Sequence, residues 1–157
     1  MSIAPIRQDV FVPIPQARAF ALFTGAMERW WPNQGCADQA EQMLAVKLEP
    51  RLGGRWYRRM GNGTDAELGT VLAWEPPGRL VLGWQVDAAM RFDPALLTEV
   101  EIRFEPAEGG TLVALEHRNL ERFGDSAVAF AQRIQGGWSA VLGGYVALAS
   151  TLAEPVS

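Results

Sequence analysis

Six segments between residues 43 and 119 alternate apolar and polar residues, and short turn sequences separate most of them. The clearest is TEVEIRFE (98–105), in which every even-numbered residue is apolar or Thr and every odd-numbered residue is charged. Successive side chains of a strand point to opposite faces, so this segment predicts a sheet with one covered face and one face in water. Because most connectors are short, neighbouring strands are expected to pair as antiparallel hairpins. The six expected strands are 43–49, 54–60, 66–75, 79–87, 96–105 and 111–119.

A seventh strand is expected at the start of the chain, over residues 6–12, where a proline-rich turn ends it. Apolar residues at helical spacing follow this turn. Gly25 is expected to divide them into two short helices, and Pro32 is expected to end the second. The apolar positions of these two helices are Phe20, Phe23, Met27 and Trp30.

The C-terminal segment carries an apolar stripe with alternating steps of three and four residues, which suits one face of a helix. This helix is expected to cover the apolar face of the sheet, which makes the fold α+β. Gly136 and Gly137 are expected to kink or break it, because each glycine costs about 1 kcal/mol in a helix interior. The stripe consists of Ala127, Phe130, Ile134, Trp138, Val141, Tyr145, Leu148 and Leu152.

Composition excludes several classes of protein. The net charge of -4 argues against a nucleic-acid partner, whose phosphates require many cations. One Cys and one His do not supply the usual ligand sets of a metal site, and no cofactor is expected. Cys36 has no partner for an intramolecular disulfide, the N-terminus lacks the apolar core of a signal peptide, and no segment reaches the roughly 18 apolar residues of a membrane span. A cytoplasmic protein is therefore expected.

The chain resembles the START-like superfamily, also called SRPBCC, which has the helix-grip fold. The resemblance rests on FALFT, ERWWP, EPRLGGRWY, GTVLAWEPPGRLVLGW, TEVEIRFEP, GGTLVALEH and the GGW of the last helix, in that order along nearly the whole chain. Within the superfamily, the chain is similar to the branch related to the C-terminal domain of the activator of the heat-shock protein 90 ATPase. The resemblance implies one domain over residues 1–157, in which a curved seven-stranded antiparallel sheet wraps around a long C-terminal helix and leaves a cavity between them.

Members of this superfamily bind apolar or amphipathic small molecules, and some are enzymes that act on polyketides. The expected function is therefore binding of a small apolar or amphipathic molecule in the internal cavity. One alternative is a polyketide cyclase-like or hydrolase-like enzyme. Another is a chaperone-activator-like interaction module, although the quoted words match only one domain of the activator. The solvent faces of strands 96–105 and 111–119 are a surface on which two copies could form a homodimer.

Arg58 is the most informative of the candidate ligand-binding residues, because it shares a strand face with Trp56 and Met60. If the apolar residues mark the inside, a buried guanidinium there needs a carboxylate, a path to solvent or an anionic ligand. The alternative is an exposed strand edge, or a strand with Tyr57 facing inward.

His117 lies on the apolar face of the last strand, either as a hydrogen-bonded core residue or as a ligand contact or proton carrier. Each aromatic candidate is either core packing or cavity wall, and Trp31 is expected to line the entrance or to plug the core. No catalytic residue is assigned. The full candidate set is Trp31, Trp56, Arg58, Met60, Trp74, Trp84, His117, Trp138 and Tyr145.

Overall fold

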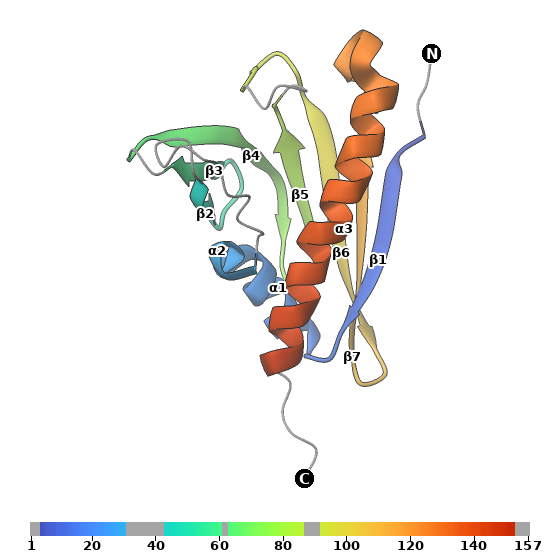
Figure 1. Cartoon of the computed structure of the whole chain (residues 1–157). Coiled ribbons are helices and arrows are strands. Elements are labelled where there is room, and N and C mark those ends of the chain that lie inside the picture. Colours follow the sequence, from blue (N-terminus) through green and yellow to red (C-terminus); the bar gives the residue numbers. More distant parts are fainter. Residues whose placement is uncertain (1–3, 31–42, 61–62, 87–91, 153–157) are drawn as a thin grey trace.

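The computed structural model describes residues 4–30, 43–60, 63–86 and 92–152 (Figure 1). Seven strands alternate with tight turns, two short helices follow the first strand, and a long helix ends the described chain. The expected α+β order is thereby confirmed. The strands are β1 (Ile6–Val12), β2 (Met43–Leu48), β3 (Arg55–Met60), β4 (Asp65–Glu75), β5 (Arg79–Trp84), β6 (Thr98–Ala107) and β7 (Gly110–Arg118). The helices are α1 (Gln16–Gly25), α2 (Met27–Trp30), the 3₁₀ helix η2 (Leu120–Ser126) and α3 (Ala127–Leu152).

The seven described strands form one antiparallel sheet in the order β1-β7-β6-β5-β4-β3-β2. Strands that follow one another from β2 to β7 are neighbours, as the short connectors predict. Of the described strands, only β1 pairs with a strand that is distant in the sequence. It pairs with β7 and places Ile6 opposite His117. In Figure 1 the sheet curves around α3, with β2, β3 and β4 bending away from the plane of β1 and β7.

The curvature of the sheet has local causes in β3 and β4. Register shifts interrupt the pairing between Trp56 and Tyr57 and between Val71 and Ala73, and such bulges bend a strand. Gly69 lies so close to the carbonyl group of Gly83 that no side chain would fit there. The absence of a side chain at this position lets the backbones of β4 and β5 approach each other closely.

Helix α3 runs unbroken through Gly136 and Gly137, so the predicted break is wrong. A Cβ atom at either position would meet no other atom within 4 Å, so the glycines interrupt no contact. The helix is stabilised by the neighbouring residues that it buries against the sheet, such as Ile134 and Trp138, and this packing offsets the low helix propensity of glycine. The predicted stripe is buried from Ala127 to Tyr145, but Leu142 and Ala149 continue it, and Leu148 and Leu152 are half-buried.

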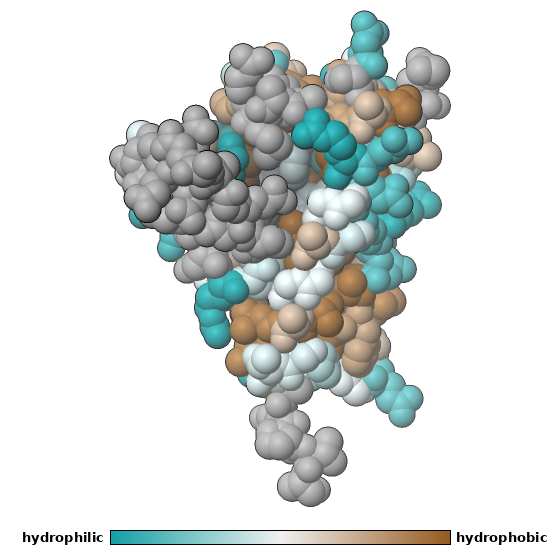
Figure 2. Space-filling model, in the orientation of Figure 1, coloured by the Kyte–Doolittle hydropathy of each residue, from teal (hydrophilic) through white to brown (hydrophobic). Residues whose placement is uncertain are grey.

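Helices α1 and α2 are separate, as expected from Gly25, and the chain turns between them at Ala26. The residue expected to end α2, Pro32, lies outside the described residues. Helix α2 approaches α3 closely because Gly144 has no side chain, and a Cβ atom there would overlap the carbonyl oxygen of Trp30. In Figure 2 hydrophobic residues gather over the lower half of the molecule, where α1 and the C-terminal half of α3 lie.

The outer face of the sheet carries charged side chains, as expected from the alternation in β6, but it is not uniformly wet. Glu101 is only 6 % exposed because Arg79, Arg103 and Arg118 surround its carboxylate. These arginines keep the pKa of Glu101 below its ordinary value although desolvation opposes them.

Among the described residues, no helix has the length and hydropathy needed to span a bilayer.

Candidate functional site

Three buried tryptophans from different elements pack edge-on or tilted against one another on the inner side of the sheet, and we call this cluster the inner wall. Trp56 of β3 and Trp84 of β5 have ring centroids 5.8 Å apart, and Trp84 lies 5.8 Å from Trp138 of α3. Strand parity places the first two on the covered face, and the apolar stripe of α3 places the third opposite them. The wall therefore connects the middle of the sheet with the covering helix.

The indole N–H groups of the inner wall all bind acceptors within the protein. Trp56 donates to the sulfur of Met27 at 3.3 Å, and Trp84 donates to the carbonyl oxygen of Val86 at 3.1 Å. Trp138 donates to Nδ1 of His117 at 3.2 Å. Because these donors are engaged, the wall presents mainly ring carbon to any molecule that lies against it.

His117 lies behind the wall, fully buried, and both of its ring nitrogens are hydrogen-bonded. Since Nδ1 accepts the hydrogen bond from Trp138, Nε2 carries the proton and donates it to the hydroxyl oxygen of Thr98, 2.8 Å away. Thr98 in turn donates to the carbonyl oxygen of Trp84 at 3.2 Å. Burial lowers the pKa of His117 to about 3, so the ring is neutral near pH 7. The network holds two tryptophans of the wall in place.

Arg58 lies one pleat beyond Trp56 on β3, where the inner face is less covered. Its side chain and that of Met60 are half-buried, whereas Trp56 is fully buried. Burial lowers the pKa of Arg58, although an arginine remains charged at neutral pH. The neighbouring Arg59 points to the outer face, is exposed and forms an ion pair with Asp65 at 3.2 Å. That Arg58 shares the face of Trp56 remains a prediction from the alternation of side chains along β3, whose pairing with β2 is regular from Val46 to Leu48.

Tyr145 belongs to a different aromatic cluster, between α3 and the two short helices. Its ring lies 5.2 Å from Phe23 and 5.2 Å from Trp30, and its hydroxyl group donates to the carbonyl oxygen of Ala19 at 2.8 Å. Burial raises the pKa of Tyr145, so the phenol remains protonated. The residue holds α1 against α3.

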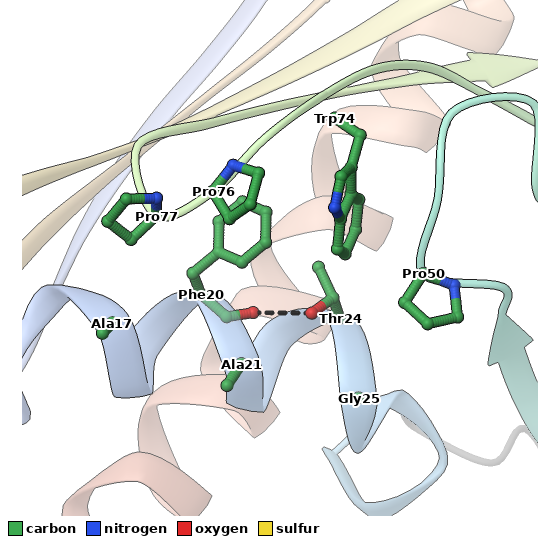
Figure 3. A pocket seen from close by; sticks show the side chains of 9 residues that line it. All are labelled: Ala17, Phe20, Ala21, Thr24, Gly25, Pro50, Trp74, Pro76 and Pro77. Carbon is green, nitrogen blue, oxygen red and sulfur yellow. Dashed lines mark hydrogen bonds between the residues drawn. The ribbon is translucent and has the colours of Figure 1, made fainter.

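Trp74 is also separate from the inner wall, because it faces α1. It lines an open hollow of about 500 Å³ between α1, the loop before β3 and the turn after β4 (Figure 3). The ring of Phe20 contacts Trp74 edge-on at 5.1 Å and closes the hollow toward the core. The lining residues are Ala17, Phe20, Ala21, Thr24, Gly25, Pro50, Trp74, Pro76 and Pro77.

The structure brings together four of the nine predicted site residues, namely Trp56, Trp84, His117 and Trp138, and places Arg58 and Met60 next to them along β3. Trp74 and Tyr145 lie elsewhere, and Trp31 lies outside the described residues. The described residues contain no group of three or more His, Cys, Asp or Glu side chains that could hold a metal ion.

Thr98 was not among the predicted residues, although it connects His117 to the strand that carries Trp84. A sequence signal for it exists, because Thr98 is the one polar residue on the apolar face of TEVEIRFE. A polar residue on a buried face usually has a hydrogen-bond partner.

Comparison with known proteins gave a family and a fold. The family model described as "Activator of Hsp90 ATPase homolog 1-like protein" matches residues 13–150. A solved structure of the anthrahydroquino-gamma-pyrone synthase Txn09, complexed with SUM, is 30% identical, with a TM-score of 0.66, and the alignment covers 92% of this chain and 96% of the synthase. A search of curated proteins found no match.

Two further solved structures share the fold at lower identity. A Rhodobacter sphaeroides protein is 21% identical, with a TM-score of 0.69 and coverage of 95% of this chain and 93% of that protein. A Chromobacterium violaceum protein is 20% identical, with a TM-score of 0.67 and coverage of 94% and 99%. At this level of identity the similarity is evidence for the fold alone.

Proposed function

The chain belongs to the family of Activator of Hsp90 ATPase homolog 1-like proteins, and from this premise we propose that it binds a small, largely apolar molecule that carries an anionic group. The apolar part of the molecule would lie against the inner wall, and Arg58 would bind its carboxylate or phenolate. The observation that carries this proposal is the inner wall of three tryptophans, with a cation predicted on the same strand face.

The division of roles follows from the hydrogen bonds. The three indole N–H groups of the wall and both nitrogens of His117 are engaged within the protein. The rings therefore favour an apolar part of the ligand, whereas the charge of Arg58 favours an anion. A charged ligand group near Arg58 would be stabilised more strongly than at the surface, because the guanidinium is half-buried.

The degree of exposure along β3 and β4 indicates the direction of entry. Trp56 and Leu68 are closed to solvent, whereas Arg58, Met60 and Ala66 are half-buried. Arg58 and Ala66 lie opposite each other in the β3–β4 pair, toward the end where these two strands turn. We therefore place the anionic end of the ligand near this turn and its apolar end against Trp56.

A synthase-type enzyme is the second candidate function, and the relative that favours it is the anthrahydroquino-gamma-pyrone synthase. In that case Arg58 would stabilise the negative charge that develops on an enolate or phenolate oxygen. His117 would position Trp84 and Trp138 rather than transfer a proton, because both of its nitrogens are hydrogen-bonded and its ring stays neutral.

The binding proposal is tested with native mass spectrometry and an anionic aromatic probe. Freshly purified protein is weighed under native and denaturing conditions, and any released molecule is identified. In parallel, the affinity for 1-anilinonaphthalene-8-sulfonate is measured by fluorescence for the wild type, Arg58→Met and Arg59→Met. The second variant is the matched control, because Arg59 is on the same strand and faces outward.

We expect Arg58→Met to weaken the probe roughly tenfold or more, the effect of one charge-assisted hydrogen bond. Arg59→Met should leave its affinity within about twofold, since exposed ion pairs contribute little. Equal affinities for Arg58→Met and the wild type would refute the anchoring role of Arg58. A synthase activity would be recognised by conversion of the identified ligand on incubation with the wild type.

A further inference from the structure

We propose a second binding site, in the hollow lined by Trp74, for an uncharged, flat molecule that carries a carbonyl or ether oxygen. The hollow is formed by α1, Pro50 and the turn at Pro76 and Pro77 (Figure 3). The inner wall contributes no residue to it. The proposal is therefore independent of the function proposed above, and each can fail without the other.

The shape of the hollow suits a flat molecule of modest size. Ala17, Ala21 and Gly25 are spaced four residues apart, so they lie on one face of α1 and form a floor of small groups. Pro76 and Pro77 lie across from this floor, and all five positions are exposed. The volume of about 500 Å³ falls within the range of small-molecule sites.

The hollow offers nothing to a charged ligand. None of its nine lining residues is ionisable, and the hydroxyl group of Thr24 already donates to the carbonyl oxygen of Phe20 at 2.8 Å. An ionised group placed there would lose hydration without gaining an ion pair, which is costly. The lining therefore selects for an uncharged molecule, in contrast to the face that carries Arg58.

One polar group in the hollow is nevertheless available, the indole N–H of Trp74, which makes no hydrogen bond with any residue that the structure describes. The other four described tryptophans differ, because each donates to an acceptor of the protein. Their acceptors are the oxygen of Leu22, the sulfur of Met27, the oxygen of Val86 and Nδ1 of His117. In Figure 3 the nitrogen of Trp74 lies on the ring edge turned toward Pro76 and Phe20. A ligand oxygen in the hollow would accept this hydrogen bond.

The test uses 9-fluorenone and fluorene, two uncharged flat probes of the same skeleton that differ in one carbonyl oxygen. Binding is followed through the indole N–H signals of ¹⁵N-labelled full-length protein, and the variant Trp74→Phe identifies the Trp74 signal. We expect fluorenone to shift this signal and to bind roughly fivefold more tightly than fluorene, the effect of one hydrogen bond. In Trp74→Phe the two probes should bind equally.

Two variants locate the probe. Ala21→Trp fills the floor of the hollow and should reduce fluorenone binding at least about tenfold, because the probe loses most of its contact area. Ala140→Trp makes the same change at an exposed position of α3 and should have no effect. If Ala21→Trp does not fold, Ala17→Trp replaces it one turn earlier.

Three results would overturn the proposal. The first is no shift of the Trp74 signal at the solubility limit of fluorenone, and the second is unchanged fluorenone binding in the folded Ala21→Trp or Ala17→Trp variant. The third is that Trp74→Phe prefers fluorenone over fluorene as strongly as the wild type does. Shifts of the Trp84 and Trp138 signals in place of Trp74 would also overturn it, because the probe would then lie on the inner wall. Fluorenone carries no charge and does not need Arg58. If Arg58→Met bound the anionic probe as well as the wild type, the proposal for the inner wall would fail, but the expected binding of fluorenone beside Trp74 would not change.

Discussion

Replacing His117 by Gln should flatten the pH dependence of stability between about pH 7.5 and pH 5. His117 is the only histidine of the chain, and burial lowers its pKa to about 3 in the folded state. In the unfolded chain its pKa returns to about 6.5. As the pH falls, the unfolded state therefore binds a proton on His117 before the folded state does. The contribution of the neutral His117 ring to the free energy of unfolding is complete above pH 6.5 and is lost as the pH falls toward 3.

The magnitude follows from the difference between the two pKa values. Stability decreases by about 1.4 kcal/mol per pH unit below the unfolded pKa, which gives a loss of about 2 kcal/mol at pH 5. The carboxylates contribute little in this window, because their unfolded pKa values lie near 4. Gln keeps an acceptor for Trp138 and a donor for Thr98 but cannot gain a proton, so His117→Gln should lose less than about 0.5 kcal/mol over the same range.

The assay is urea unfolding followed by tryptophan fluorescence and circular dichroism, for the wild type and His117→Gln, at several pH values from 7.5 to 5. A lower stability of the variant at every pH does not affect the comparison, because only the change with pH is compared. Parallel curves for the two proteins would refute the conclusion that His117 is buried as a neutral ring.

Two further predictions concern α3. Gly137→Ala should raise the free energy of unfolding by about 0.5 to 1 kcal/mol, because its Cβ atom meets only open space, whereas Gly144→Ala should lower it, because the Cβ atom would overlap the carbonyl oxygen of Trp30. Urea unfolding of both variants checks this, and a gain at both positions would contradict the close approach of α2. Tyr145→Phe should cost about 1 kcal/mol through loss of the hydrogen bond to Ala19, and an unchanged melting temperature would contradict it.

The strands could be predicted because hairpins are local. The eight residues 98–105 are enough to show which side chains face the core and which face water. The five residues EPPGR are enough to mark the turn between β4 and β5. The prediction of a helix break at Gly136 and Gly137 was wrong, because helix propensity describes only the local sequence. Helix α3 is stabilised by contacts with residues far away in the sequence.

The candidate site could be predicted only in part, for the same reason. The alternation of side chains along β3 and β5 was enough to place Trp56 and Trp84 on the covered face. The contact between His117 and Trp138 could not be predicted in this way, because it depends on how α3 is rotated above the sheet. The hollow beside Trp74 was not predicted, since three segments distant in sequence form it. Arg58 could be placed by alternation because its neighbours on β3 are strongly apolar or charged.

The pairing of β1 with β7 has a consequence for the newly made protein. Ile6 lies opposite His117, so the first strand has no partner until nearly the whole sheet has been synthesised. At roughly 5 to 20 residues per second, a ribosome needs on the order of 5 to 20 s to make the intervening chain. Helix α3 follows β7, so the apolar face of the sheet is covered last of all. A nascent chain interrupted before α3 would expose that face and become a substrate for chaperones and proteases.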